Sequence, residues 1–325
     1  MAVYRRRLTA VIVLANVTVI CAGASAVAPA AARKSPARQA VVHIDAFDRM
    51  PVVRPVYEQP KSVPVAPLPD GTHQLFPGHR IVAFYGAAGA PALGVLGSGS
   101  PDAVWQRLTR EAAPYRTRHV DVLPSYELIA FLATGSRGNQ GNYSSRLPDA
   151  TIARYARAAK RHHGLLILDV QPGHGSFVAD ARSLRKWLLL PNVGLALDPE
   201  WQLYGAERPL SRIGHTNAHA VNQVSHWLNR LTRVNHLPQK LLLVHEFTDD
   251  MVRNKPALRT RRHLAMVFNV DGFGSRGAKV GKYQDFARDR RFPLGFKLFY
   301  DWDIDMMAAR DVLRLHPRPA VVEYE

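Results

Sequence analysis

The chain is almost without cysteine, with a single one, Cys21, among 325 residues. Cys21 lies in an apolar stretch near the N-terminus, and Ile20 before it is a poor fit for the small residue that precedes a lipid-modified cysteine. If this stretch is removed, the remaining chain has no cysteine. It can then form neither a disulfide nor a thiol nucleophile, so other side chains must supply its chemistry.

Acidic residues are scarce beside basic ones. The chain has 26 Asp and Glu against 43 Lys and Arg, which gives a formal net charge of +17. This balance favours association with anionic polymers such as those of a cell wall, although a solvated basic surface that aids solubility is equally consistent with it. A nucleic-acid partner is not expected, because the sequence contains no nucleic-acid recognition motif.

Two cofactor motifs are also absent. The segment from Gly86 to Gly89 lacks the glycine spacing and the following acid of a dinucleotide-binding fingerprint. The first predicted strand carries no His-x-His pair, which amidohydrolase-type metal sites use. A divalent ion could still bind a set drawn from later strands, namely Asp169, Asp198, His245 and Asp271. The sequence nevertheless predicts neither a metal nor an organic cofactor.

The N-terminus has the layout of an export signal. Three arginines at positions 5–7 precede an apolar run, and small residues follow up to Ala32. This pattern predicts a secretory signal peptide over 1–32 and a secreted or cell-surface protein, with an uncleaved membrane anchor as the alternative. Residues 33–78 are rich in proline and lack helical periodicity, which predicts an extended linker.

After the linker, apolar runs alternate with amphipathic segments, which is typical of βα units and a parallel sheet. We expect six regular helices, at 101–115, 148–163, 176–190, 217–234, 279–290 and 305–315. Eight strands are expected: Ile81–Gly86, Leu128–Thr134, Leu165–Gln171, Val193–Glu200, Leu241–Phe247, Leu264–Asp271, Phe296–Asp301 and Ala320–Glu323.

Eight such units in about 245 residues fit a (β/α)8 TIM barrel, predicted over 79–325. A doubly wound open sheet is the alternative. The fifth connection, 248–263, is interrupted by Pro256 and predicts no regular helix. No residue follows Glu325 to form an eighth helix, so we expect the linker or a shorter N-terminal piece to cover that flank.

The predicted strands end in polar residues, and a barrel of this kind builds its active site from those ends. On most strands the polar residues share one parity, so they would face one cavity. Any one of them could simply cap a helix, but burying many ionisable groups is costly unless they pair or bind a ligand. The expected ligand-contacting residues are Asp169, Gln171, Asp198, His245, Glu246, Asn269, Lys297 and Glu323.

The segment Val193–Trp201, VGLALDPEW, carries the leading catalytic candidate. Along an extended strand Gly194, Ala196, Asp198 and Glu200 would share a face. Glu200 is predicted to be the general acid/base, with its proton retained by partial burial and by the charge of Asp198.

A second catalytic carboxylate is expected on a later strand. Asp301 is predicted to be the nucleophile or base, with Asp271 as second candidate. Lys297 is expected to form an ion pair with Asp271, Asp301 or Glu323 rather than a Schiff base.

Aromatic residues stand beside the acids: Tyr85, Trp201, Phe273 and Trp302. Flat rings next to carboxylates suit a sugar, which presents apolar faces to stack on and hydroxyls to hydrogen-bond, although such rings also pack under barrel rims. We therefore predict a monomeric glycoside-hydrolase-like enzyme that cleaves an extracellular or cell-wall polysaccharide. The alternative is a non-catalytic barrel that binds cell-wall glycan.

Four segments, LDVQPG, VGLALDPEW, LPQKLLLVHEF and DGFGS, resemble those of secreted or lipid-anchored actinobacterial proteins with a glycoside-hydrolase-like barrel. The resemblance spans about Ile81 to Trp302 and implies fold and export. A weaker likeness is to chitinase-like hydrolases, whose Asp-x-Asp-x-Glu run matches Asp198 and Glu200 but has Ala196 in place of the first acid. Retaining barrel glycosidases are similar at Glu200, with Asp301 where a Glu is usual.

Overall fold

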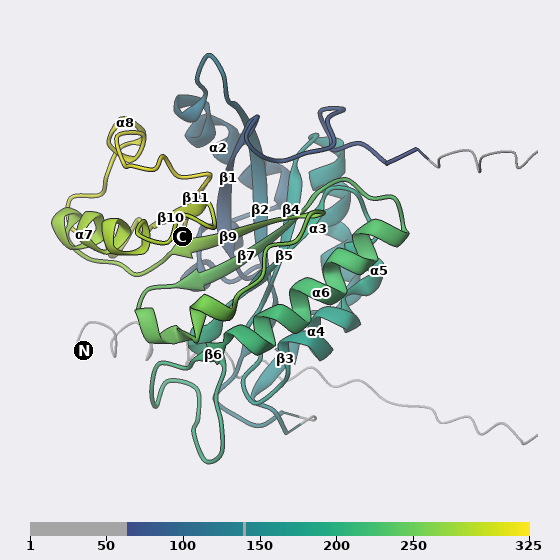
Figure 1. The fold of residues 1–325 in the computed structure, drawn as a ribbon, viewed down its shortest axis with the longest axis vertical. Helices are drawn as coiled ribbons and strands as arrows, with labels where there is room; N and C mark the ends of the chain where they lie inside the picture. The colour runs from purple at the N-terminus through teal and green to yellow at the C-terminus, as the bar shows by residue number, and fades with distance from the viewer. Residues whose placement is uncertain (1–63, 139–140) are drawn as a thin grey trace, which may run out of the picture. The chain divides into compact units, whose positions relative to one another are not determined.

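The computed structural model describes residues 64–138 and 141–325, which belong to one compact unit (Figure 1). The predicted signal peptide and most of the predicted linker lie outside the described residues and stay predictions. In the described ranges, no helix combines the length and the apolar character needed to cross a membrane.

Eight parallel strands close into a barrel, because the first strand pairs with both the second and the last. The prediction of a (β/α)8 barrel is confirmed. In order around the barrel the strands are β1 (His79–Gly86), β2 (Asp121–Ala133), β4 (Leu165–Val170), β5 (Val193–Leu197), β7 (Lys240–Glu246), β9 (Leu264–Val270), β10 (Leu294–Leu298) and β11 (Val321–Tyr324). Three short strands lie outside it: β3 (Ser144–Arg146), β6 (Thr216–Asn217) and β8 (Val252–Arg253).

Helices pack around the strands, with α3 to α6 on one side and α7 and α8 on the other (Figure 1). Residues 249–257 of the fifth connection form two short 3-10 turns around β8, as the interrupting proline led us to expect. The segment predicted at 176–190 is two helices, and the one predicted at 305–315 is a single short turn. The helices are α2 (Pro101–Ala112), α3 (Asp149–Arg161), α4 (Phe177–Ser183), α5 (Arg185–Leu188), α6 (Ala218–Val234), α7 (Arg276–Phe286) and α8 (Ala309–Val312).

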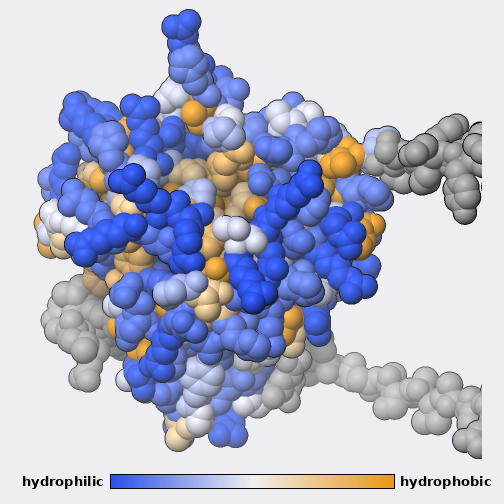
Figure 2. Space-filling view, viewed as in Figure 1, coloured by the Kyte–Doolittle hydropathy of each residue, from blue (hydrophilic) through white to orange (hydrophobic). Residues whose placement is uncertain are grey.

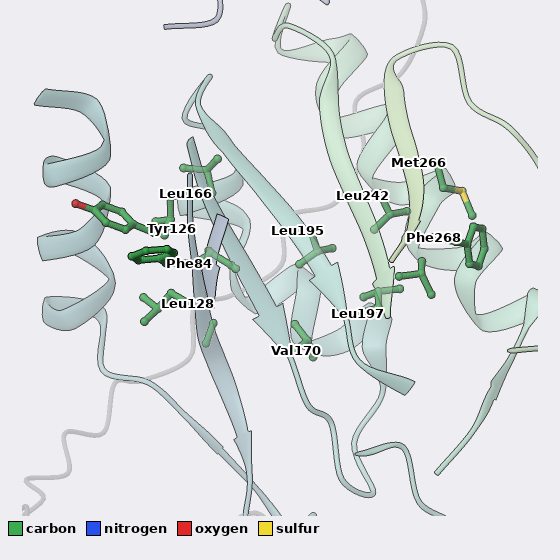
Figure 3. Close-up of a cluster of buried hydrophobic side chains, with 14 of the residues drawn as sticks. Phe84, Tyr126, Leu128, Leu166, Val170, Leu195, Leu197, Leu242, Met266 and Phe268 are labelled. Atoms are coloured by element: carbon green, nitrogen blue, oxygen red, sulfur yellow. The ribbon is translucent and has the colours of Figure 1, made fainter. Parts of the chain in front are cut away.

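The main hydrophobic core lies between the strands and the helices (Figure 3). Alternate strand residues point outward into it, such as Leu166 on β4, Leu195 on β5 and Leu242 on β7, and each is fully buried. The remaining strand residues point into the barrel, so the parity read from the sequence divides the two faces correctly. Hydrophilic residues cover most of the face that Figure 2 shows.

Residues 64–78 close the N-terminal end of the barrel. Leu68 and Leu75 are buried against its interior residues. The backbone N–H of Leu75 donates to Oε1 of Gln239 at 2.9 Å, and that of Ala66 donates to the carbonyl of His236 at 2.8 Å. This part of the predicted linker therefore packs as part of the folded barrel.

The flank between β11 and β1 is covered by the turn that follows α2. The hydroxyl of Tyr115 lies 2.6 Å from that of Tyr324 on β11, and Arg80 on β1 donates to the carbonyls of Tyr115 and Pro319. Tyr115 thus fills a place that we had expected the N-terminal segment to fill, since its ring reaches the outer face of the last strand.

Candidate active site

The interior of the barrel has an apolar half and a polar half. The apolar half contains Ile167, Leu243, Val267 and Val321 and is closed from below by Leu68 and Leu75. Two residues further along each strand the side chains become polar, and this level is also buried. It comprises Tyr85, Glu127, Asp169, Asp198, His245, Asn269, Lys297 and Glu323.

His245 is the centre of the polar half. Its Nε2 lies 2.8 Å from Oε1 of Glu127, and its Nδ1 lies 3.0 Å from Oδ2 of Asp271 and 3.8 Å from Oε2 of Glu323. Burial alone would lower the pKa of His245, but the charges of Glu323 and Glu127 outweigh this and raise it well above its usual value. The imidazole is therefore a cation that donates to two carboxylates.

Lys297 is the second cation of the site. Its Nζ lies 2.9 Å from Oε2 of Glu325, 3.4 Å from Oδ2 of Asp271 and 3.7 Å from Oε2 of Glu323. It also lies 3.6 Å from the centroid of the Tyr85 ring. Burial opposes its charge, but Asp271, Glu323 and Glu325 raise its pKa. Lys297 is thus an ion-pair partner, in agreement with the role expected from the sequence, rather than a neutral amine ready to form a Schiff base.

Asp271 is the carboxylate that these two cations hold ionised. Burial alone would raise its pKa, but Lys297 and His245 outweigh burial and hold it well below the usual range. The backbone N–H of Gly272 also donates to its Oδ1 at 2.5 Å. Asp271 lies just after β9 and lines the cavity described below, so its negative charge faces any bound ligand.

Asn269 connects this group to the last strand. Its Nδ2 donates to Oε2 of Glu323 at 2.6 Å. The opposite residue on β10 is Gly295, and a Cβ placed there would lie only 2.3 Å from Oδ1 of Asn269. The glycine is required because the amide is held between that backbone and Glu323.

Gly295→Ala is therefore expected to lower the free energy of unfolding by about 1–3 kcal/mol, measured by chemical denaturation. Gly281→Ala on α7 is the control, since nothing lies within 4 Å of the added methyl group. We expect that change to be neutral or to stabilise by about 0.5–1 kcal/mol, because alanine favours a helix. Equal effects at both positions would contradict a steric role for Gly295.

Asp169 lies behind the cavity on β4. The hydroxyl of Tyr85 donates to its Oδ2 at 3.3 Å, and Nε2 of Gln171 donates to the same hydroxyl at 3.0 Å. Burial raises the pKa of Asp169 to about 7. The cation of His245 opposes this shift, and the charge of Glu127 adds to it. This carboxyl can gain or lose a proton near neutral pH.

Asp198 and Glu200 stand at the end of β5, although the strand ends earlier than expected. The strand stops at Leu197, and Pro199 begins a single 3-10 turn, so strict alternation fails beyond Asp198. Asp198 is nevertheless buried in the polar half, and Glu200 lines the cavity. Burial, followed by the charges of Glu200 and Asp169, raises the pKa of Asp198 well above its usual value.

A cavity of about 190 Å³ opens at the C-terminal ends of the strands. It brings together carboxylates and amines with several aromatic rings. The polar, charged and aromatic residues that line it are Tyr85, Gln171, Glu200, Trp201, Phe247, Asp271, Phe273, Lys282, Lys297, Phe299 and Glu325. The cavity therefore contains seven of the residues predicted from the sequence, with Asp169, Asp198, His245, Asn269 and Glu323 buried behind them.

Three further predicted residues neither line this cavity nor belong to the buried group behind it. Asp301 lies in the exposed turn after β10, so the expectation that it faces Glu200 is wrong. Glu246 points to the outside of the barrel, where Lys255 lies 2.7 Å from its Oε1. Trp302 stands beside the cavity as a neighbour of Phe273, with ring centroids 5.9 Å apart.

Three charged residues of the site were not predicted. Glu127 lies in the first half of β2, which was not predicted as a strand because it contains Pro124. Glu325 lies two residues after the end of the last predicted strand. Lys282 comes from α7 and lies 5.3 Å from the centroid of the Phe247 ring. If the two predicted strands had extended to Glu127 and Glu325, the alternation of side chains along them would have placed both glutamates in the barrel interior.

Glu127, His245 and Glu323 also form a group of possible metal ligands, with atoms within 4.8 Å of one another. Both nitrogens of His245 face carboxylates at hydrogen-bond distance, and Lys297 lies beside Glu323. Two cations are thus already built into this group of acids, so we assign no metal to it. Of the four ligands considered from the sequence, only His245 belongs to this group.

No protein-family model matches the chain, and no curated protein matches it. Among solved structures, 2,3-dimethylmalate lyase, a member of the PEP mutase/isocitrate lyase superfamily, is 11% identical with a TM-score of 0.43, over 77% of each chain. Thermotoga maritima Cel5A, solved in complex with cellobiose, is 9% identical with a TM-score of 0.38, over 75% of this chain and 88% of its own. These likenesses are too distant to bear on the reaction.

Proposed function

We propose that the chain is an exported glycoside hydrolase that acts on an extracellular or cell-wall polysaccharide. The observation that carries the proposal is Asp271, a carboxylate held ionised by two buried cations in the wall of a cavity that also contains Glu200 and Trp201. Glycosidic cleavage needs such a pair of carboxyl groups, one that gives a proton and one that is charged.

Glu200 is the general acid of this scheme. It would give its proton to the oxygen of the glycosidic bond as that bond breaks. Burial and the charge of Glu200 raise the pKa of Asp198, so the scheme requires that the proton of this pair of carboxyl groups be on Glu200 when substrate is bound. Asp271 would be the second catalytic carboxylate. It would either attack the anomeric carbon of the sugar or accept a proton from the attacking water.

The aromatic rings and the size of the cavity support a sugar as ligand. Trp201 and Phe273 offer flat faces on which a sugar ring can stack. The cavity, at about 190 Å³, is below the range of about 300–1,000 Å³ that is usual for drug-sized ligands. We therefore expect one sugar ring to bind inside and the rest of the polymer to extend outward.

The test is hydrolysis of a panel of polysaccharides by the full chain, followed as new reducing ends, beside Glu200→Gln. The substitution should lower the rate by about a hundredfold to ten-thousandfold. Loss of a general acid is expected to matter much less for an aryl glycoside, whose leaving group needs no proton. Turnover of both substrate types at the wild-type rate would exclude Glu200 as the acid.

Absence of turnover across the panel would refute the proposal. Glycan binding without turnover, unchanged in Glu200→Gln, would instead identify the barrel as a non-catalytic glycan-binding protein. Calorimetry with the same panel of polysaccharides would measure that binding.

A further inference from the structure

The end of the barrel opposite the cavity is ringed by basic side chains. The segments that lead into the strands all lie at this end, because the strands are parallel. Before β2, β4, β7, β9, β10 and β11 these segments carry exposed arginines or lysines. We call this surface the basic end and define it by Arg118, Lys160, Arg233, Arg262, Arg290 and Arg318.

Acidic side chains do not neutralise the basic end. The nearby acids pair with other side chains: Asp70 with His79 at 2.5 Å, Asp121 with Arg116 at 3.9 Å, Asp285 with Arg288 at 2.9 Å and Asp289 with Arg291 at 2.6 Å. Within residues 64–138 and 141–325, none of the six defining side chains lies within 4.0 Å of a carboxylate oxygen. Their positive charges are therefore presented to solvent together.

Neighbouring segments of the basic end share one positive field. His263, which precedes β9, has its pKa lowered by burial and then by Arg262 and Arg233, which belong to two different segments. Helix dipoles do not account for the ring. Arg118, Arg262 and Arg318 lie outside the last turn of any helix, where a cation would be favoured for that reason.

Exposed apolar side chains lie among these charges. Val65, Leu190 and Val234 are 44%, 37% and 51% exposed. Ala66 next to Val65 hydrogen-bonds to His236, two residues after Val234, and Lys240 at the start of β7 donates to the carbonyl of Leu190. The three side chains thus belong to adjacent segments of the same end.

We propose that the basic end docks on an anionic phospholipid bilayer. Lipid phosphates would contact the arginines, and Val65, Leu190 and Val234 would enter the interface between head groups and acyl chains. Because the basic side chains surround the end of the barrel, a flat bilayer could contact all of them at once. A single polymer strand could contact only those on one side. Docking in this way turns the cavity away from the membrane, and the contact is made by the barrel itself, whether or not the N-terminal segment is kept as an anchor.

The test is co-sedimentation of the full chain with vesicles of phosphatidylglycerol and phosphatidylcholine, and with vesicles of phosphatidylcholine alone. The wild type should partition at least about ten times more strongly to the anionic vesicles at low salt and lose this preference at about 0.5 M salt. Every variant retains residues 1–63, so any binding by that segment is common to all of them.

Arg233→Glu/Arg262→Glu should reduce the anionic preference at least about tenfold. The matched control is Arg208→Glu/Arg253→Glu, which makes the same charge change on exposed residues of segments that follow strands. Val234→Asp should weaken binding without removing a basic residue. Thermal unfolding of each variant confirms that it is folded.

Equal losses in the two double variants would overturn the proposal, since net charge alone would then explain binding. The absence of any preference for anionic vesicles would overturn it too. So would strong binding to soluble poly(glycerol phosphate) by a chain that ignores the vesicles.

Discussion

Asp271→Asn is expected to lower the rate of glycan hydrolysis by about a hundredfold to ten-thousandfold, while substrate still binds. The amide keeps the shape of the carboxylate but carries no charge. His245 and Lys297 would remain protonated beside it, so the substituted site would present positive charge where the reaction needs negative charge. The measurement is kcat on the polysaccharide that the wild type cleaves, together with KM.

Asp301→Asn is the matched control for this prediction. Asp301 is an exposed aspartate in the turn after β10 and does not line the cavity. We expect its substitution to leave kcat and stability unchanged. A loss of activity at Asp301 as large as that at Asp271 would show that the charged group of the cavity is not the one that reacts.

Lys297→Met is expected to lower the free energy of unfolding by about 3–5 kcal/mol. Methionine has a similar length and can still cover the Tyr85 ring, so little packing is lost. The main cost is electrostatic, because Asp271, Glu323 and Glu325 would lose a cation that lies between 2.9 and 3.7 Å away. The shift in denaturant midpoint at constant slope measures this effect.

Lys282→Met provides the comparison, since Lys282 lines the same cavity but is only partly buried, and no carboxylate partner within 4.0 Å is found for it among the described residues. We expect it to cost less than about 1 kcal/mol. Adding Glu325→Gln to Lys297→Met should recover part of the lost stability, because one of the stranded charges is removed. If the two lysine substitutions cost the same, the buried ion pairs do not hold the barrel end together.

The sequence predicted the barrel well because its strands are buried apolar runs, whose length and spacing are easy to recognise. Parity then placed Asp169, Asn269, Lys297 and Glu323 in the interior, since alternation along a strand is a geometric property of the backbone. The sequence offered Asp271 as one partner of Lys297, but parity does not tell which acids each cation holds. That depends on distances between strands far apart in sequence.

The errors occur where the backbone leaves the strand. β10 ends at Leu298, and the chain then turns, with the backbone N–H of Phe299 donating to Asp303 at 3.0 Å. Lys279 holds Asp303 at 2.7 Å, so Asp303 fixes this turn and Asp301 is left at the surface. Glu127 was missed for the opposite reason, because Pro124 lies inside a strand that continues through it.

The pairing of the first barrel strand with the last has a consequence for the order in which the chain can fold. Ile81 on β1 pairs with Val321 on β11, and Glu323 and Glu325 reach Lys297 only once β11 is in place. During synthesis from the N-terminus the chain therefore holds an open barrel with partly unmatched charges until β11 has been made. Such long-range closure is slow, so we expect β11 to be the last strand to gain protection from hydrogen exchange during refolding.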